Sequence, residues 1–264
     1  MSSHSPTKTR SPRKIGNPPR GADASDREQR TFVLLRAAIL LLVIIGLAWL
    51  TVARNAVYDD SITLWKDTIN KSPRKARTHF GLGDAYERYG QMDNAIKEYH
   101  QAVELQPNYA RAFYNLGTAY FHEERWDEAI EALKKATELK PNYERALFNL
   151  GMAYVRRGRL MDAERSLSTA LSLDPQSVDT MMNLGGVHYL RNELLEAMLL
   201  YQKVLVLQPQ RIDARMNLAK TYRQMGRSLD ARRECELVLQ AQPSNAEAAA
   251  MLRDLGGTDR KPRR

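Results

Sequence analysis

The sequence has a single cysteine, Cys235, among 264 residues, so no disulfide can form within one chain. Zinc sites built from closely spaced Cys and His residues are absent, because the five histidines are scattered along the chain. No phosphate-binding loop or glycine-rich dinucleotide turn occurs, and we expect the repeat frame to bring no histidine together with a nucleophile or an acid. We therefore expect a protein that is not an enzyme and that holds no metal and no cofactor.

Nucleic-acid signatures are also missing, although the net charge is +9. Residues 1–30 hold seven Lys/Arg against three Asp/Glu, whereas residues 54–264 are only mildly basic, with 32 against 28. There is no RNP, zinc-finger or helix-turn-helix pattern. We expect no nucleic-acid partner. We interpret residues 1–30, which are rich in Ser, Pro, Gly and charge, as a disordered basic tail, and residues 257–264 as a second basic tail.

One long apolar run stands out, FVLLRAAILLLVIIGLAWLTVA, at residues 32–53. As a helix it would extend about 33 Å, against about 30 Å of bilayer hydrocarbon. Arg36 lies near one end and Trp49 near the other, where such residues reach the headgroups. No cleavage site follows, so we predict a transmembrane signal anchor. The positive charge before it predicts a cytoplasmic amino terminus and an extracytoplasmic body, in a periplasm or lumen.

Beyond this run, proline recurs every 34 residues. With proline at position 32 of each unit, position 7 is Leu in all five units, position 8 is Gly or Ala, and position 20 is always Ala. These units resemble tetratricopeptide repeats. The resemblance implies an all-α fold, a right-handed α-solenoid of stacked helical hairpins. The five units are 76–109, 110–143, 144–177, 178–211 and 212–245.

Two shorter segments continue this frame. Residues 58–73 align with the second helix of a preceding unit and place Trp65 at position 24, which predicts a half-repeat. Residues 246–256 predict a capping helix, because Arg253 stands where the repeats have a small residue. The junction at residues 54–77 also resembles the one before the repeats of polytopic mannosyltransferase-like membrane proteins. This chain lacks their many spans and their loop of catalytic acids, so the resemblance implies no transferase activity.

Position 6 is asparagine in four consecutive units, and the first unit has Gly81 there. A side-chain amide both donates and accepts hydrogen bonds, so it can bind a peptide backbone whatever the side chains of that peptide are. The pattern is similar to the asparagine ladder in the superhelix of O-linked N-acetylglucosamine transferase. The alternative is that each amide bonds to a neighbouring helix. The four residues are Asn115, Asn149, Asn183 and Asn217.

Two further rows accompany the asparagines. Position 5 is large and apolar, and it either lines a binding groove or packs between adjacent helices. Position 2 is basic in the first three units and acidic in the last two, so the basic half of a groove would attract acidic segments. The groove candidates beside the asparagines are therefore Phe80, Tyr114 and Phe148 at position 5, and Arg77, Arg111 and Arg145 at position 2.

Together these features predict a single-pass, membrane-tethered scaffold that binds an extended peptide segment of a partner protein in its concave groove. Two alternatives stay open. One is an accessory subunit, or a non-catalytic remnant, of a membrane glycosyltransferase system. The other is a structural protein that self-associates through its convex faces or its end caps.

Overall fold

A computed structural model describes residues 32, 34–49 and 61–257 of the chain, and the regular elements in this part are all helices. The chain divides into two units, residues 1–60 and residues 61–264. The first unit is helical at residues 34–49, where the apolar side chains are exposed. None of the described helices combines the length and the apolar character needed to cross a bilayer. The tail at 1–30, residues 33 and 50–53 of the expected span, residues 58–60 and residues 258–264 lie outside the described part.

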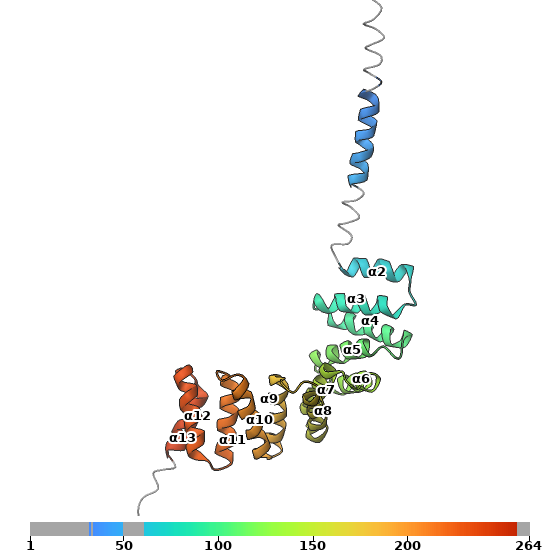
Figure 1. The fold of residues 1–264 in the computed structure, drawn as a ribbon. Coiled ribbons are helices and arrows are strands. Elements are labelled where there is room, and N and C mark those ends of the chain that lie inside the picture. The colour runs from blue at the N-terminus through green and yellow to red at the C-terminus, as the bar shows by residue number, and fades with distance from the viewer. Residues whose placement is uncertain (1–31, 33, 50–60, 258–264) are drawn as a thin grey trace, which may run out of the picture. The chain divides into compact units, whose positions relative to one another are not determined.

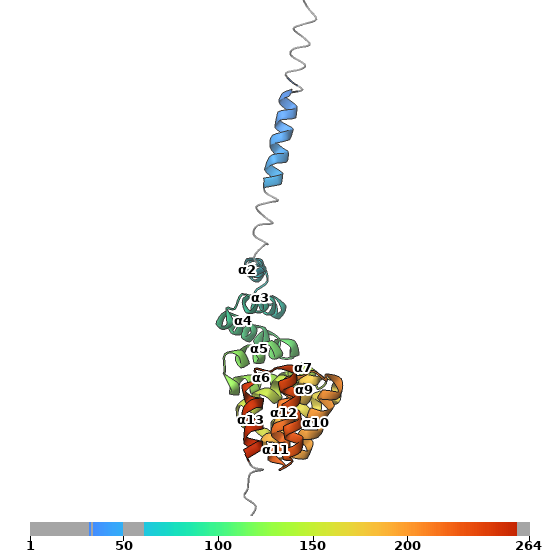
Figure 2. The ribbon, with the colours of Figure 1, turned by 90° about the vertical axis from the view of Figure 1, so that its left-hand side faces the viewer.

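The second unit is a row of helices that alternate between 13 and 14 residues through the five repeats. Each helix packs against the next one along the chain (Figures 1 and 2). The first helices of successive repeats also contact one another from α5 to α11. The helices are α2 Ser61–Lys71, α3 Ala76–Arg88, α4 Met92–Leu105, α5 Ala110–His122, α6 Trp126–Leu139, α7 Glu144–Arg156, α8 Leu160–Leu173, α9 Val178–Leu190, α10 Leu194–Leu207, α11 Ile212–Gln224, α12 Ser228–Ala241 and α13 Ala246–Gly257.

The turn inside each hairpin uses one residue with a positive φ, at position 15 of the repeat. Glycine occupies it in three repeats, where the left-handed conformation carries little steric cost. The second and fourth repeats place Glu124 (φ 57°) and Asn192 (φ 62°) in the same conformation. The hairpin geometry therefore overrides the preference of the Glu124 side chain.

Close packing inside each hairpin depends on a small residue at position 8, opposite position 24. A Cβ added to Gly117 would lie 2.6 Å from Cγ of Leu133. The fifth repeat has Ala219 at position 8, and there position 24 is the smaller Cys235, in the same buried cluster. Burial raises the pKa of the Cys235 thiol above its ordinary value, so the thiol stays protonated and serves packing.

Position 4 lies opposite position 23 in the repeat frame, and in the first and last repeats the two side chains are polar and contact each other. Nδ1 of His79 lies 2.8 Å from Glu98, and its Nε2 lies 2.9 Å from the carbonyl oxygen of Pro73. Arg215 repeats the arrangement, donating to Glu234 at 3.0 Å and to the carbonyl oxygen of Pro209 at 2.8 Å. The middle repeats have the pairs Phe113 and Ala132, Leu147 and Ser166, and Met181 and Leu200.

Candidate functional site

The predicted groove residues lie on the first helices of the repeats, α3, α5, α7, α9 and α11. All four asparagines at position 6 are half-buried, so their amides are partly accessible to solvent. What each amide bonds to depends on position 9 of the preceding repeat, which is 31 residues earlier in the chain. The four amides consequently differ in the hydrogen bonds that they make.

The first two amides bond to the neighbouring repeat. Nδ2 of Asn115 donates to Oδ1 of Asp84 at 2.7 Å and to the hydroxyl of Tyr99 at 3.2 Å. Nδ2 of Asn149 donates to Oγ1 of Thr118 at 3.1 Å. In both cases position 9 of the preceding repeat supplies the acceptor. These two contacts match the alternative of a bond to a neighbouring helix.

The last two amides have no such acceptor, because position 9 of the preceding repeat is Met152 for Asn183 and Gly186 for Asn217. Nδ2 of Asn183 donates instead to the carbonyl oxygen of Asp179 on its own helix, at 2.8 Å. Within the described part of the chain, the Asn217 amide makes no hydrogen bond. Both amides line a cavity of about 380 Å³, here called the carboxy-terminal cavity. Its walls are Val155, Asp179, Met182, Asn183, Gly186, Val187, Leu190, Arg211, Asp213 and Asn217.

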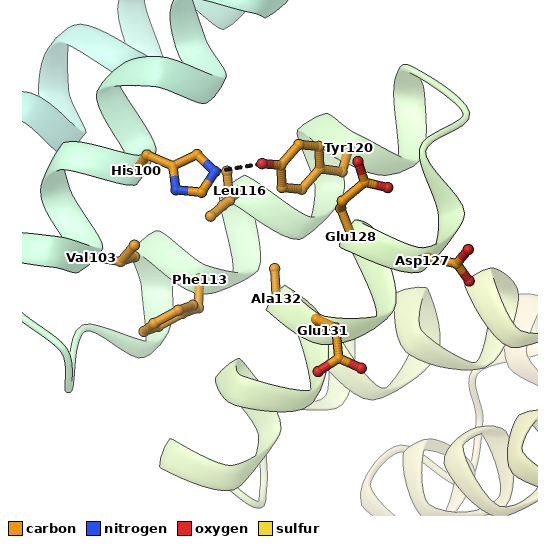
Figure 3. A pocket seen from close by; sticks show the side chains of 9 residues that line it. All are labelled: His100, Val103, Phe113, Leu116, Tyr120, Asp127, Glu128, Glu131 and Ala132. Carbon is orange, nitrogen blue, oxygen red and sulfur yellow. Dashed lines mark hydrogen bonds between the residues drawn. The ribbon is translucent and has the colours of Figure 1, made fainter.

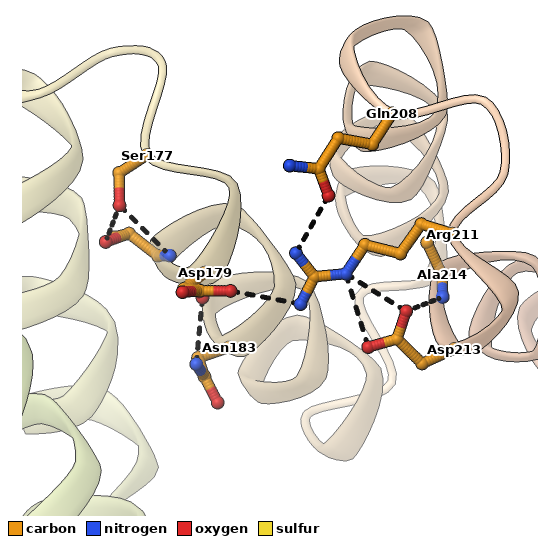
Figure 4. A network of polar contacts seen from close by, with 8 residues as sticks. Ser177, Asp179, Asn183, Gln208, Arg211, Asp213 and Ala214 are labelled. Atoms are coloured by element: carbon orange, nitrogen blue, oxygen red, sulfur yellow. Dashed lines mark hydrogen bonds and ion pairs between the residues drawn. The ribbon is translucent and has the colours of Figure 1, made fainter.

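The two acids at position 2 beside this cavity share one arginine (Figure 4). Arg211 donates from Nη2 to Asp179 at 3.0 Å and from Nε to Asp213 at 3.0 Å. The hydrogen bond with Asp213, followed by the one with Asp179, raises the pKa of Arg211 above its ordinary value. The acidic character that position 2 indicates for this end of the groove is thus partly neutralised.

At the other end of the row, Trp65 occupies the place that the asparagine takes in the later repeats. A Cβ on Gly81 would lie 2.5 Å from the indole ring of Trp65, so only glycine fits there without a shift. Trp65 lies on α2 and forms one wall of a second cavity, of about 560 Å³, here called the amino-terminal cavity. The other residues that line it are Arg77, Phe80, Gly81, Asp84, Gln106, Tyr109 and Arg111.

The aromatic residues at position 5 pack largely within the protein. Phe80 is buried, with the Tyr109 ring 5.2 Å from its own. Tyr114 packs against Tyr143 at 4.9 Å between ring centroids. Phe148 is half-buried and packs against the core cluster. Of the three, Phe80 also lines the amino-terminal cavity, so packing and groove lining coincide there.

The three arginines at position 2 are exposed. Arg111 places its guanidinium over the Phe80 ring at 4.8 Å and lies 3.7 Å from Asp84. Neither Arg77 nor Arg145 forms an ion pair with any residue that the structure describes. The amino-terminal cavity therefore presents guanidinium groups that have little or no internal neutralisation.

Asp84 sits below these arginines as a hydrogen-bond acceptor. Besides Asn115, the hydroxyl of Tyr99 lies 2.9 Å from it and 2.5 Å from Glu87, so the two carboxylates compete for one proton. Burial, with the Glu87 and Asp84 carboxylates nearby, raises the pKa of Tyr99, so this hydroxyl remains a donor through the physiological range. The repeat pattern did not predict this cluster around Asp84.

A third cavity, of about 490 Å³, lies between α4, α5 and α6 (Figure 3). His100 bonds to the Tyr120 hydroxyl at its edge, and Phe113, Leu116 and Ala132 are among its apolar walls. The acids at its rim are already paired within the protein: Asp127 with Arg157, Glu128 with Arg125, and Glu131 with Lys134. The sequence pattern did not predict this cavity. The small Ala132 at position 23 is the signal that could have indicated it.

Solved structures with a similar fold include YrrB, described as a TPR protein with an unusual peptide-binding site (TM-score 0.66, 21% identity, 70% of this chain and 96% of that chain). MamA is also similar (TM-score 0.62, 25% identity, 65% and 94%). PilF of Pseudomonas aeruginosa matches with a TM-score of 0.61 and 18% identity, over 80% of this chain and 94% of that chain. No curated protein matches this sequence.

Four family models match the repeat region. Two models described as "Tetratricopeptide repeat" match units of the predicted frame, residues 110–143 and residues 212–245. A third with the same description matches residues 148–212, and one described as "TPR repeat" matches residues 88–123. The matches agree with the stacked helical hairpins of the structure. Residues 88–143 and 148–245 of this chain are therefore tetratricopeptide repeats.

Proposed function

We propose that this protein is a membrane-tethered scaffold that binds an extended peptide segment of a partner protein along the first helices of its repeats. The observation that carries the proposal is the pair of amides in the carboxy-terminal cavity. Asn217 has no partner among the described residues, and Asn183 bonds only to its own helix. A half-buried amide that is not fully bonded offers a donor and an acceptor for a backbone peptide group.

Support for the peptide as ligand comes from two directions. The fold is that of tetratricopeptide repeats, and the similar protein YrrB is described as having a peptide-binding site. The carboxy-terminal cavity adds apolar walls beside the amides, such as Met182 and Leu190. Apolar side chains next to polar groups that converge on one cavity are a common feature of binding sites.

The membrane tether rests on the amino-acid sequence of residues 32–53 and on the positive charge before it. Protease accessibility of the repeats in sealed membrane vesicles tests both the tether and the extracytoplasmic orientation. Release of the intact chain by alkaline carbonate would contradict the tether.

The peptide-binding role is tested by selection from a random peptide library on the full-length chain in detergent. We expect the double variant Asn183→Ala/Asn217→Ala to recover far fewer peptides than the wild type. The matched control Asn115→Ala/Asn149→Ala removes the same groups where the donors already bond inside the protein, so recovery should largely persist. Circular dichroism checks that each variant is folded. Equal recovery by the wild type and the first variant would refute the role of these amides.

Self-association is a second candidate, and one observation favours it. The outer side of α10 exposes Leu195, Leu199 and Val206, where α6 has the acids Asp127, Glu131 and Glu138. Exposed apolar surface of this kind is typical of interaction sites. The variant Leu195→Asp/Leu199→Glu/Val206→Glu gives α10 the acids that α6 has at these positions. It should abolish crosslinked dimers of the full-length chain if copies associate through this face. Undiminished crosslinking would exclude α10 as the contact.

A further inference from the structure

Building on the proposed peptide-binding function, we propose that the amino-terminal end of the groove is selective for acidic peptide segments. The ligands would be side-chain carboxylates bound by Arg77 and Arg111. This goes beyond peptide binding in general, since it assigns a chemistry to the ligand and a direction to its placement along the repeats. Four features of the described residues carry it.

The first feature is the set of aromatic side chains that line the amino-terminal cavity. The indole of Trp65, brought in from α2 over Gly81, forms one side of the amino-terminal cavity, and the Phe80 and Tyr109 rings form another. The volume, about 560 Å³, lies within the range that binds drug-sized groups, so side chains of a peptide fit into it. Rigid aromatic walls restrict how a ligand can lie beneath the arginines.

The second feature is positive charge at the mouth of this cavity that is neutralised only in part. Arg77 is exposed and forms no ion pair within the described residues. Arg111 has one long ion pair, with 3.7 Å between its Nη2 and Asp84. A planar guanidinium binds a carboxylate through two parallel hydrogen bonds, and a weakly hydrated guanidinium over an aromatic ring suits this role. Arg111 is already placed in this way, at 4.8 Å over Phe80.

The third feature is that the one carboxylate lining the cavity is occupied. Oδ1 of Asp84 accepts from Asn115 at 2.7 Å and lies 2.9 Å from the Tyr99 hydroxyl, which also lies 2.5 Å from Glu87. Oδ2 of Asp84 lies 3.7 Å from Arg111. Both oxygens of this carboxylate therefore already have partners within the protein. This leaves the two arginines as the groups that face a ligand.

The fourth feature is the contrast along position 2. Arg77, Arg111 and Arg145 are followed by Asp179 and Asp213, which are bridged by Arg211. The basic side chains therefore extend over three repeats and stop. Packed helices lie about 8–10 Å apart, and a peptide in the polyproline II conformation rises about 3.1 Å per residue with about three residues per turn, so every third side chain faces the same side. An acidic residue at every third position would thus meet successive arginines.

The test uses the same random peptide library on the full-length chain, followed by sequencing of the recovered peptides. We expect enrichment of Asp and Glu, with a spacing of three residues. The variant Arg77→Glu/Arg111→Glu should lose this enrichment and favour Lys and Arg. The control Arg165→Glu/Arg233→Glu makes the same change in net charge at exposed positions of α8 and α12, and it should keep the acidic preference.

A direct measurement follows with one recovered peptide, labelled with fluorescein, and its copy with Asn and Gln in place of Asp and Glu. The neutral copy should bind at least about tenfold more weakly, and the difference should shrink as salt screens the charges. If the milder variant Arg77→Gln/Arg111→Gln binds both peptides alike, the selectivity resides in these arginines. If it still prefers the acidic peptide, the assignment is wrong.

The outcomes separate the two proposals. If the wild type recovers no peptides above background, peptide binding itself fails. If it recovers peptides that depend on Asn183 and Asn217 but show no acidic enrichment, peptide binding stands and the present inference is overturned.

Discussion

The two ends of the asparagine row use the same side chain at the same repeat position for different purposes. Asn115 donates to Asp84, and Asn149 donates to Thr118, so both amides join adjacent repeats. At the other end, Gly186 leaves Asn217 without an acceptor in the described part of the chain. A repeat consensus therefore does not settle what a residue does. The residue 31 positions earlier decides whether the amide stabilises the stack or remains available.

The strongest challenge to this comparison is Asp84→Ala. The substitution removes the acceptor that lies 2.7 Å from the Asn115 amide and the acid nearest to Arg111, whereas the buried Tyr99 hydroxyl keeps Glu87 as its acceptor. Loss of a partner for half-buried donors costs about 1–3 kcal/mol, and urea unfolding of the purified chain measures it. As a control, Asn217→Ala should change the free energy of unfolding by no more than about 0.5 kcal/mol. Equal effects of both substitutions would show that the two ends do not differ.

A second variant gives Asn217 an acceptor of the kind that Asn115 has. Gly186→Asp places at the fourth repeat the acid that Asp84 supplies at the first. A Cβ at Gly186 meets only the Tyr201 hydroxyl, at 3.9 Å, so the side chain fits. We expect a gain of about 1 kcal/mol, from better helix propensity and a new bond to Asn217. Peptide recovery should fall at the same time.

The matched control for that conversion is Gly186→Ala, which supplies the propensity gain without the acceptor. Peptide binding should survive in the alanine variant, with a stability gain close to that of the aspartate. Loss of binding in the alanine variant would mean that space at Gly186, and not the freedom of Asn217, matters for the ligand.

The smallest expected effect concerns the weaker of the two inter-repeat bonds. Thr118→Val removes the Oγ1 acceptor of Asn149 but keeps the shape of the side chain. A neutral, half-buried hydrogen bond contributes about 0.5–1.5 kcal/mol, so we expect a loss near the lower figure by thermal unfolding. A loss as large as that for Asp84→Ala would show that charge does not distinguish the two bonds.

Much of the fold follows from the period of the sequence. The 34-residue frame places the hairpins, the turn residues at position 15 and the small residues at position 8, because these positions repeat in every unit. It also places the position-2 arginines of the first three repeats and the position-6 asparagines of the last four on the first helix of their repeat. These features depend on local helix geometry and on packing that is the same in each unit.

The frame could not predict contacts that depend on departures from the consensus. In the repeat frame, Gly81 is simply a position without the asparagine of the later repeats. In the structure, its lack of a Cβ leaves the space that the Trp65 ring of another helix occupies. Similarly, Phe80 belongs to the predicted groove but is buried, because Tyr109 and Arg111 cover its ring. Which amide has an acceptor depends on two residues in different units, and each unit read alone hides that pairing.

The polar contacts of His79 in the first repeat and Arg215 in the last bear on how such an array changes length. His79 and Arg215 each connect an acid of their own repeat to the carbonyl oxygen of the proline that precedes it. That proline is present before every unit, so neither pair depends on the identity of its neighbour. A gene duplication or deletion of one interior unit would therefore leave both terminal units chemically intact. These two contacts, unlike the hydrogen bonds between adjacent repeats, are thus independent of how many units lie between the first repeat and the last.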